Sequence, residues 1–271
     1  MNDFMKSYFD SQKIEYFSVI DYAHCRETLG RLIERENFTP RSVIIYLLPY
    51  YAGETVNISR YAASLDYHIA IKQVGDGLIS RIKEKFPSAS CKSYGDHSPI
   101  DERHAALAAG LGILGDSGLI INEKYGTYIF VGDVITDIPP EELGAKAPLP
   151  IVKCEGCGAC RAACPTGILR GEGADCLSAI TQKKGELTDD EKELMRKYNT
   201  AWGCDECQTS CPHNSAPRLT TIPFFREKNI FNLTREMLDG MSDEEFSSRA
   251  FAWRKRATVE RNLEILSKKT I

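Results

Sequence analysis

The chain has 271 residues, enough for one large domain or two modest ones that each bury a core. Charged residues make up 27% of the sequence and the net charge is -4, which argues against a nucleic-acid binder that is basic over its whole surface. The longest apolar run, residues 43–52, is too short to span a bilayer and contains a proline. Because the N-terminal stretch is also unlike a signal peptide, we expect a cytoplasmic protein without membrane attachment.

The first half of the chain has the pattern of an α/β region. Residues 41–50, RSVIIYLLPY, and residues 125–136, YGTYIFVGDVIT, are rich in β-branched and aromatic side chains and predict strands. Between them, residues 74–87, VGDGLISRIKEKFP, predict an amphipathic helix that is closed by Pro87.

A second helix is predicted over residues 98–112, SPIDERHAALAAGLG. We expect Ser98 to cap this helix and Pro99 to occupy its first position. Asp101 would complete a capping box, and Gly110 would end the helix.

A proline-rich stretch, residues 138–150, marks a domain boundary. The tail after the cysteine-rich segment predicts helix, with Ser242 and Glu245 as a capping pair. The fold class we expect is α/β (α+β) at the N-terminus, then a cysteine-rich domain, then a short helical tail. The corresponding segments are residues 1–145, 146–220 and 221–271.

Eight of the ten cysteines lie between Cys154 and Cys211, and the other two, Cys25 and Cys91, are more typical of inert buried thiols. In a cytoplasmic chain, such close spacing indicates metal or redox chemistry rather than disulfides. The stretch CEGCGACRAACPTGIL has the spacing C-x2-C-x2-C-x3-C-P of bacterial ferredoxins, in which the fourth cysteine ligates the other cluster. This pattern predicts a bacterial-ferredoxin-like domain.

A second group, WGCDECQTSCPHN, supplies three more cysteines, and one stands between the groups in DCLSAI. The pseudo-symmetry of the two groups predicts a crosswise assignment to two [4Fe–4S] clusters. Two four-cysteine zinc sites would use the same eight thiolates and remain the alternative. The predicted ligand sets are Cys154, Cys157, Cys160 and Cys211 for one cluster, and Cys164, Cys176, Cys204 and Cys207 for the other.

Several motifs in order, ISRYAASLDYH, GDHSPIDERHAALAAGLGILGDSGLIIN, the first cysteine run, CLSAIT and GCDECQTSCPHN, resemble the epoxyqueuosine reductase family. The resemblance covers residues 41–266 and implies a cobalamin-dependent iron–sulfur oxidoreductase of tRNA queuosine modification, related in design to reductive dehalogenases. The implied reaction removes an epoxide oxygen from a cyclopentane ring on the wobble base. The chain resembles a short form without the C-terminal helical-repeat domain.

The resemblance also implies site residues. Asp96 in GDHSP matches the family's proton donor; taken alone, it would be a loop aspartate bonded to local backbone. The expected cofactor contacts are Tyr67, His68, Asp96, Gly115, Ser117 and Ser178. No histidine is expected to ligate the cobalt. The glycines equally suit the packing of helix on strand.

The sequence departs from the family pattern at Asp116, where members have a lysine, and in the short loop between Cys164 and Cys176. Residues 249–271 carry seven basic side chains and two acidic ones, which suits either a phosphate-binding face or a solvated helix face. The basic residues are Arg249, Arg254, Lys255, Arg256, Arg261, Lys268 and Lys269.

The expected partners are a tRNA anticodon stem-loop and an external low-potential electron donor, and we expect a monomer. Two alternatives from other classes stay open: a cobalamin and iron–sulfur reductase of a different, small-molecule substrate, and a ferredoxin-like electron carrier whose N-terminal half only docks a partner. The carrier is disfavoured because it does not need a whole α/β domain that bears an acid motif.

Overall fold

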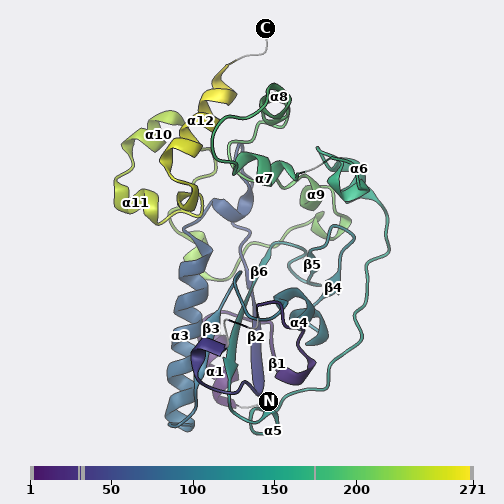
Figure 1. The fold of residues 1–271 in the computed structure, drawn as a ribbon, viewed down its shortest axis with the longest axis vertical. Coiled ribbons are helices and arrows are strands. Elements are labelled where there is room, and N and C mark those ends of the chain that lie inside the picture. Colours follow the sequence, from purple (N-terminus) through teal and green to yellow (C-terminus); the bar gives the residue numbers. More distant parts are fainter. Residues whose placement is uncertain (1–2, 30, 32–33, 174, 269–271) are drawn as a thin grey trace. The chain divides into compact units, whose positions relative to one another are not determined.

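The computed structural model describes residues 3–29, 31, 34–173 and 175–268 (Figure 1). The chain forms two compact units, the first from Met1–Pro49 and His68–Gly156, the second from Tyr50–Tyr67 and Cys157–Ile271. Residues 50–67 therefore group with the C-terminal part, although they stand in the N-terminal half of the sequence. The division into residues 1–145, 146–220 and 221–271 stays a prediction.

The first unit is built on a four-stranded antiparallel sheet of order β1-β2-β6-β3. The two strands predicted from apolar runs are confirmed as β2 and β6, and β2 is buried along its whole length because it lies in the middle of the sheet. The strands are β1 (Phe17–Asp21), β2 (Ser42–Pro49), β3 (Cys91–Tyr94) and β6 (Ile129–Thr136), with a separate hairpin of β4 (Ile113–Leu114) and β5 (Ile120–Ile121).

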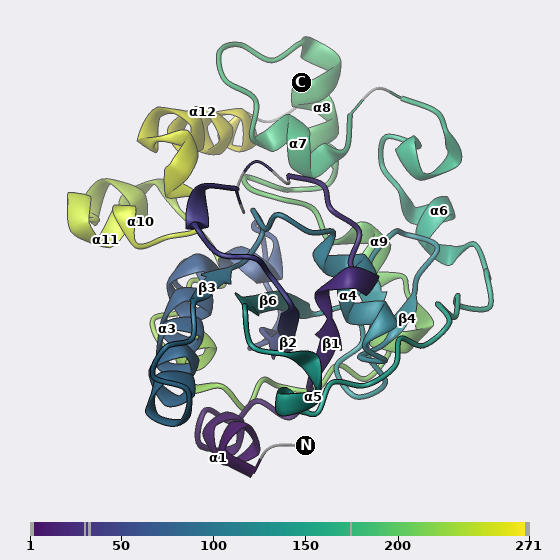
Figure 2. The same cartoon turned by 60° about the horizontal axis from the view of Figure 1, so that its bottom comes forward.

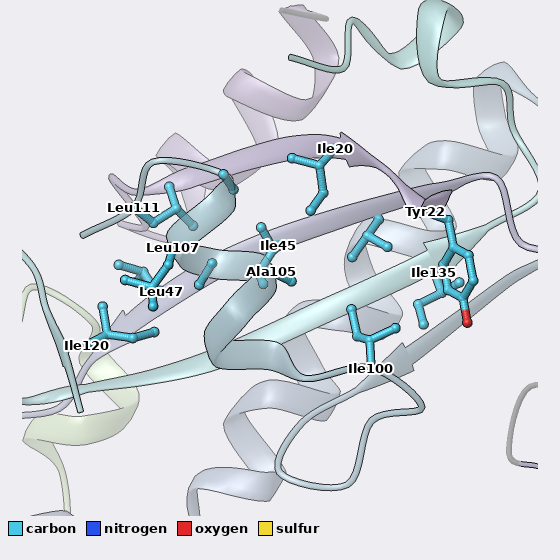
Figure 3. Packing of buried hydrophobic residues seen from close by; sticks show 13 residues of the cluster. Ile20, Tyr22, Ile45, Leu47, Ile100, Ala105, Leu107, Leu111, Ile120 and Ile135 are labelled. Carbon is cyan, nitrogen blue, oxygen red and sulfur yellow. The ribbon is translucent and has the colours of Figure 1, made fainter. Parts of the chain in front are cut away.

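Helices cover both faces of this sheet (Figure 2). Helices α1 (Asp3–Ser11) and α3 (Tyr67–Lys85) lie on one face, where Tyr8 Oη donates to the carbonyl of Val74 at 2.7 Å. Helix α4 (Glu102–Ala108) covers the other face and closes an apolar core with β1, β2 and β6 (Figure 3). The helix predicted over residues 74–87 is confirmed as the greater part of α3. Other short helices among the described residues of this unit are η1 (Tyr22–His24), η2 (Glu34–Glu36) and α5 (Pro140–Leu143).

The start of α4 corrects the predicted cap. Asp101, not Ser98, is the N-cap, and its side chain accepts from the backbone N–H of His104 at 3.0 Å. The backbone before it is extended because Ile100 forms an antiparallel bridge with Glu27, so Ser98 stands outside the helix. Its hydroxyl instead accepts from the N–H of Ile100 at 3.4 Å. The predicted stop is confirmed, since Gly110 takes φ +76 directly after the last helical turn.

The second unit consists of short helices around two apolar clusters. Trp202 is fully buried against Phe251, and a bridge between Ile58 and Trp202 ties residues 50–67 into this core. The capping box of Ser242 and Glu245 is confirmed at the start of α11. The helices are η3 (Arg60–Ala62), α6 (Ala159–Ala163), η4 (Ile168–Arg170), α7 (Leu177–Thr181), α8 (Asp189–Lys197), α9 (Glu206–Thr209), η5 (Pro212–Asn214), η6 (Pro223–Arg226), α10 (Arg235–Gly240), α11 (Asp243–Ser247), η7 (Ala252–Arg254) and α12 (Arg256–Ser267).

Within the described part of the chain, no helix combines the length and the apolarity that crossing a bilayer requires.

Candidate functional site: a cysteine cluster and an acid beside a groove

The cysteines occupy helix ends and loops. Cys154 belongs to the first unit and the other seven of the group to the second. Helix α6 carries Cys160 and packs against α9, which carries Cys207, so the first and second cysteine groups of the sequence meet within the second unit. Cys164 follows the last turn of α6 and Cys176 directly precedes α7.

The thiols of the second unit lie close enough to affect one another. Burial raises the pKa of Cys204 to about 12, and the neighbouring thiols of Cys176 and Cys207 contribute. Burial likewise raises the pKa of Cys207 to about 12, with further contributions from Cys176, Asp205, Cys160 and Cys164. Cys176, Cys204 and Cys207 thus form one neighbourhood, and both Cys160 and Cys164 lie near enough to act on Cys207. The division of these cysteines between two clusters stays a prediction.

Backbone N–H groups surround two of the sulfurs. Burial raises the pKa of Cys164, but the backbone N–H groups of Leu169, Thr166 and Gly167 outweigh it, and the pKa is lowered overall. The N–H of Asp116 donates to the Sγ of Cys154 at 3.3 Å. Such N–H···S contacts favour the thiolate, which is the form that ligates metal. The sulfur environment therefore fits an iron–sulfur cluster.

No group of three or more histidine, cysteine or acidic side chains in the described ranges is arranged to hold a single metal ion. The two isolated cysteines behave as expected for inert thiols, because burial raises the pKa of Cys25 to about 12 and also raises that of Cys91.

A buried ion pair fixes the loop between Cys204 and Cys207. Asp205, which is 8% exposed, accepts through Oδ2 from the backbone N–H of Arg60 at 2.7 Å and from its Nη1 at 3.2 Å. The hydroxyl of Ser59 donates to Oδ1 of Asp205. Since a buried charge is tolerated only when it is paired and hydrogen-bonded, this network anchors the cysteine loop to residues 50–67.

In the first unit, the two motifs that the sequence singled out lie together. Nε2 of His68 is 3.6 Å from Oδ2 of Asp96. Asp96 has φ +63, a left-handed conformation that is uncommon outside glycine, and its N–H donates to Oε1 of Glu102 at 3.0 Å. Both side chains are at least half exposed, so the chain alone does not desolvate Asp96.

A groove of about 510 Å³ runs beside this pair. It lies along α3 and the edge strand β3, and the residues on either side of Asp96, Gly95 and His97, line it together with His68. Its walls mix cationic and apolar side chains, including Lys72, Lys92, Ile71 and Tyr94. The volume is within the range of about 300–1,000 Å³ that small-molecule and cofactor sites occupy.

Two acids near this site, Glu102 and Asp133, were not predicted from the sequence. Burial raises the pKa of Glu102 to about 8, with a further contribution from Asp133. Asp133 on β6 is fully buried, and burial raises its pKa to about 7. The sequence signal for Asp133 is a single aspartate inside an otherwise apolar strand run, YIFVGDVIT.

The other residues expected at the cofactor have local roles. A Cβ at Gly115 would lie 3.0 Å from the carbonyl of Leu119, so glycine suits the close approach within the β4–β5 hairpin, and Ser117 lies in its turn. Tyr67, at the start of α3, packs edge-on against Tyr61 at 6.3 Å. Ser178 in α7 accepts a hydrogen bond from the amide of Gln182. Their contact with a cofactor stays a prediction.

Internal contacts engage several of the basic tail residues. Arg249 donates to the carbonyl of Lys228, Arg256 to those of Leu238 and Met241, and Arg261 to that of Lys183. Lys268 pairs with Glu264, and Lys269 lies outside the described residues. Arg254 stacks on the exposed ring of Trp253 at 3.8 Å. These contacts give the arginines a structural role within the second unit.

The cysteine arrangement and the mixed α/β first unit define an iron–sulfur protein with an added α/β domain. Residues 153–214 match the family described as a 4Fe-4S double cluster binding domain. Over 225 residues, covering 76% of this chain and 68% of the relative, the sequence is 32% identical to epoxyqueuosine reductase of Gloeobacter violaceus. The chain belongs to the epoxyqueuosine reductase family and is therefore homologous to an oxidoreductase.

Two further comparisons define the extent of the match. Epoxyqueuosine reductase of Staphylococcus aureus is 33% identical over 205 residues, which are 73% of this chain and 52% of that protein, so the chain spans about half the length of this relative. A crystal structure of epoxyqueuosine reductase with a tRNA-Tyr epoxyqueuosine-modified tRNA stem loop superposes with a TM-score of 0.79 at 23% identity, covering 97% of this chain and 80% of that one. This structural likeness establishes the fold.

Proposed function

We propose that the chain is an epoxyqueuosine reductase-type enzyme, which removes the epoxide oxygen from a modified wobble base of tRNA and leaves an alkene. The observation that carries this proposal is the pairing of His68 with Asp96 beside the groove of the first unit, in a chain of this family. These side chains come from the two N-terminal motifs that resemble the family.

The double cluster domain would deliver the electrons. We keep the crosswise assignment of the cysteines to two clusters. The shared neighbourhood of Cys176, Cys204 and Cys207 supports placing these three at the same cluster. The N–H groups around Cys164 and Cys154 would stabilise the bound thiolates. The proposed sets are Cys154, Cys157, Cys160 and Cys211, and Cys164, Cys176, Cys204 and Cys207. An external low-potential electron donor would reduce the clusters again after each turnover.

The face of the first unit that bears the groove is the proposed cobalamin site, because the groove combines apolar walls with convergent polar groups that could hold an edge of the corrin. His68 and His97 would bind polar groups of the corrin, and Tyr67, Gly115, Ser117 and Ser178 remain proposed contacts. Cobalamin, when bound, supplies the strongly reducing centre of the reaction, while the protein provides orientation and protons.

Asp96 is the proposed proton donor. Its left-handed backbone and the hydrogen bond to Glu102 set the direction of its side chain, and His68 lies on the other side of the carboxyl. The carboxyl is exposed in the chain itself, so substrate and cofactor would have to exclude water for it to hold a proton at neutral pH.

A related enzyme was solved with a tRNA stem loop, which supports tRNA as substrate here. The internal contacts of Arg249, Arg256 and Arg261 favour a second candidate, the same redox chemistry on another substrate, because they withdraw these arginines from a phosphate-binding face. Both candidates share the clusters, the corrin and Asp96.

The test uses protein purified without oxygen and loaded with iron, sulfide and cobalamin. First, gel filtration should leave the corrin bound to the protein. A single turnover with a strong chemical reductant should then convert the epoxide of an epoxyqueuosine-containing tRNA stem-loop to the alkene. Mass spectrometry of the nucleoside measures this conversion. A loaded protein that leaves the epoxide intact would refute the tRNA reaction and favour the second candidate. Loss of all corrin on gel filtration would favour an electron carrier.

A further inference from the structure

A carboxyl group lies in the apolar core of the first unit. Asp133 is 0% exposed and stands on β6 between Val131 and Ile135, both of which pack into the cluster beneath α4. No hydrogen bond of ordinary geometry from the described residues reaches either of its oxygens, although the Ser98 hydroxyl is near enough to lower its pKa somewhat. An ionised carboxylate in such a place is costly, so the protonated acid is favoured.

Glu102, the first residue of α4, is the neighbour of this acid. Burial is the main cause that raises the pKa of Glu102 to about 8, and the charge of Asp133 raises it further. Burial raises the pKa of Asp133 to about 7. Two neighbouring carboxyls in one desolvated place do not both ionise at neutral pH, so the pair retains a proton there.

The surroundings of the pair add negative rather than positive charge. Asp96 and Asp101 act on Glu102 from the loop and the helix cap. Burial is the main cause that raises the pKa values of Tyr46 on β2, Tyr94 on β3 and Cys25 after β1, and Asp133 raises each of them further. The largest electrostatic influences on Glu102 are therefore acidic, and that on Asp133 is the neutral hydroxyl of Ser98. These surroundings favour the protonated form of the pair.

Glu102 links the buried pair to the site. Its Oε1 accepts the hydrogen bond from the N–H of Asp96 at 3.0 Å, which places the acid directly at the backbone of the proposed proton donor. Asp96 is in turn 3.6 Å from Nε2 of His68. Glu102 therefore stands between a buried acid and an exposed one.

We propose that Glu102 and Asp133 form a proton store that recharges Asp96 during the reaction. This inference rests on the proposed function, because reduction of an epoxide to an alkene and water takes up two electrons and two protons, and Asp96 holds a single proton. In the recharging step, the Glu102 carboxylic acid gives its proton to the Asp96 carboxylate and becomes a carboxylate. Glu102 then regains a proton from Asp133 in molecules where both acids are protonated, and from water otherwise, so the pair does not stay doubly ionised and no electron moves.

The first test measures single-turnover rates of the cofactor-loaded protein across pH, with the epoxyqueuosine stem-loop as substrate. The wild-type rate should fall as pH rises through about 8, where Glu102 loses its proton. Glu102→Gln keeps an oxygen acceptor for the Asp96 N–H but carries no acidic proton. Its rate should be lower by about 10²-fold, the low end of general acid catalysis, and should lack this fall with pH.

Two further variants separate the store from simple positioning. Asp133→Asn removes the neighbouring negative charge, so the pKa of Glu102 should drop and the fall in rate should move to lower pH. Glu84→Gln, at an exposed acid on α3 paired with Arg81, is the matched control and should follow the wild type. If Glu102→Gln follows the wild type at every pH, the store does not exist.

A second readout is independent of activity. Infrared difference spectra between wild type and Glu102→Gln, and between wild type and Asp133→Asn, should show the carbonyl band of a protonated carboxylic acid at neutral pH that disappears near pH 8. Carboxyls that are already ionised near pH 5 would overturn the inference even if the enzyme is active. A band that titrates as expected in a protein that does not reduce the stem-loop would support the store and refute the substrate.

Discussion

The backbone N–H of Asp116 donates a hydrogen bond to the Sγ atom of Cys154 at 3.3 Å. The N–H of Cys154 donates to the carbonyl of Leu114 at 2.9 Å, so this cysteine is held at both its backbone and its sulfur by the β4–β5 hairpin. Because the contact uses the backbone of Asp116, it does not depend on which side chain stands at this position. The side chain nevertheless adds a negative charge near a proposed cluster ligand.

Replacing the charge of Asp116 should change the reduction potential of the cluster but not its assembly. Asp116→Lys retains the N–H···S bond and exchanges a negative for a positive side chain, so the reduction potential of one cluster should rise while the iron content stays the same. Asp116→Asn should give a smaller rise. Reductive titration followed by electron paramagnetic resonance measures both, and a variant that loses iron would show that the side chain itself holds the loop.

Iron and sulfide content distinguishes two [4Fe–4S] clusters from two zinc sites, since either would use eight cysteine thiolates. Protein purified without oxygen should carry about eight irons and eight acid-labile sulfides, as two [4Fe–4S] clusters require. Replacing Cys207 by Ser should remove about half of both, because Cys207 lies in the neighbourhood of Cys176 and Cys204 and is a proposed ligand of one of the two clusters. Stoichiometric zinc without sulfide would establish the zinc alternative instead.

Local patterns in the sequence predicted those parts of the fold that local physics decides. The apolar run of β2 and the amphipathic run of α3 formed the expected elements, because burial and periodicity act within each segment. The prediction that Ser98 caps α4 was wrong, because Ile100 forms a bridge with Glu27, a residue far away in the sequence. The grouping of residues 50–67 with the cysteine unit likewise depends on long-range contacts such as the bridge between Ile58 and Trp202.

The candidate site was predicted to a similar extent. The spacing of the cysteines and the motif around Asp96 were visible in the chain. The partners of Asp96 were not, because the hydrogen bond to Glu102 and the burial of Asp133 arise only when α4 packs on β6. A lone acid in a strand run gives no indication of which face it occupies or what covers it.

The Arg60–Asp205 pair should be important for stability. Both side chains are no more than 10% exposed, and Arg60→Met would leave the Asp205 carboxylate buried without its cation. Breaking a buried pair in this way costs about 3–5 kcal/mol. Urea unfolding of cluster-loaded protein should therefore show a clearly lower midpoint for Arg60→Met, and a smaller decrease for Arg60→Lys.

The matched control for this pair is Arg81→Met, which removes an exposed arginine paired with Glu84 in α3. Exposed pairs of this kind contribute about 0–1 kcal/mol, so its midpoint should stay near the wild type. Equal midpoints for Arg60→Met and Arg81→Met would show that Ser59 and the backbone N–H of Arg60 suffice to hold Asp205.

Asp96→Asn tests the acid directly. Asparagine tolerates the left-handed backbone at this position and keeps the N–H that donates to Glu102, so the fold, the clusters and the corrin should be retained. It cannot supply a proton, and product formation in a single turnover should fall by about 10²–10⁴-fold. An equally fast variant would rule out Asp96 as the donor, and His68→Gln would then be the next variant to measure.

The buried acids also make stability depend on pH. The pKa of Glu102 is raised to about 8 and that of Asp133 to about 7, above their ordinary values of 4.5 and 3.8, so the folded state binds more protons than the unfolded state in between. The stability that this provides is fully present below pH 4 and is lost as pH rises towards 8. Because one pKa unit corresponds to about 1.4 kcal/mol, the free energy of unfolding should fall by several kcal/mol across this pH range.

The corresponding measurement is urea unfolding of the wild type and Asp133→Asn between about pH 5 and pH 9. Because the two proteins share all other titratable groups, their difference reports on Asp133. Asparagine has no charge to bury, so its stability should decline less over this range, and the two proteins should differ most at the alkaline end. Their difference should level off above pH 8, since no further proton is released from the pair. A difference that is constant from acid to alkaline pH would mean that Asp133 is already ionised in the folded protein at pH 5. It would then need a cationic or hydrogen-bonding partner, in contrast to the apolar surroundings between Val131 and Ile135.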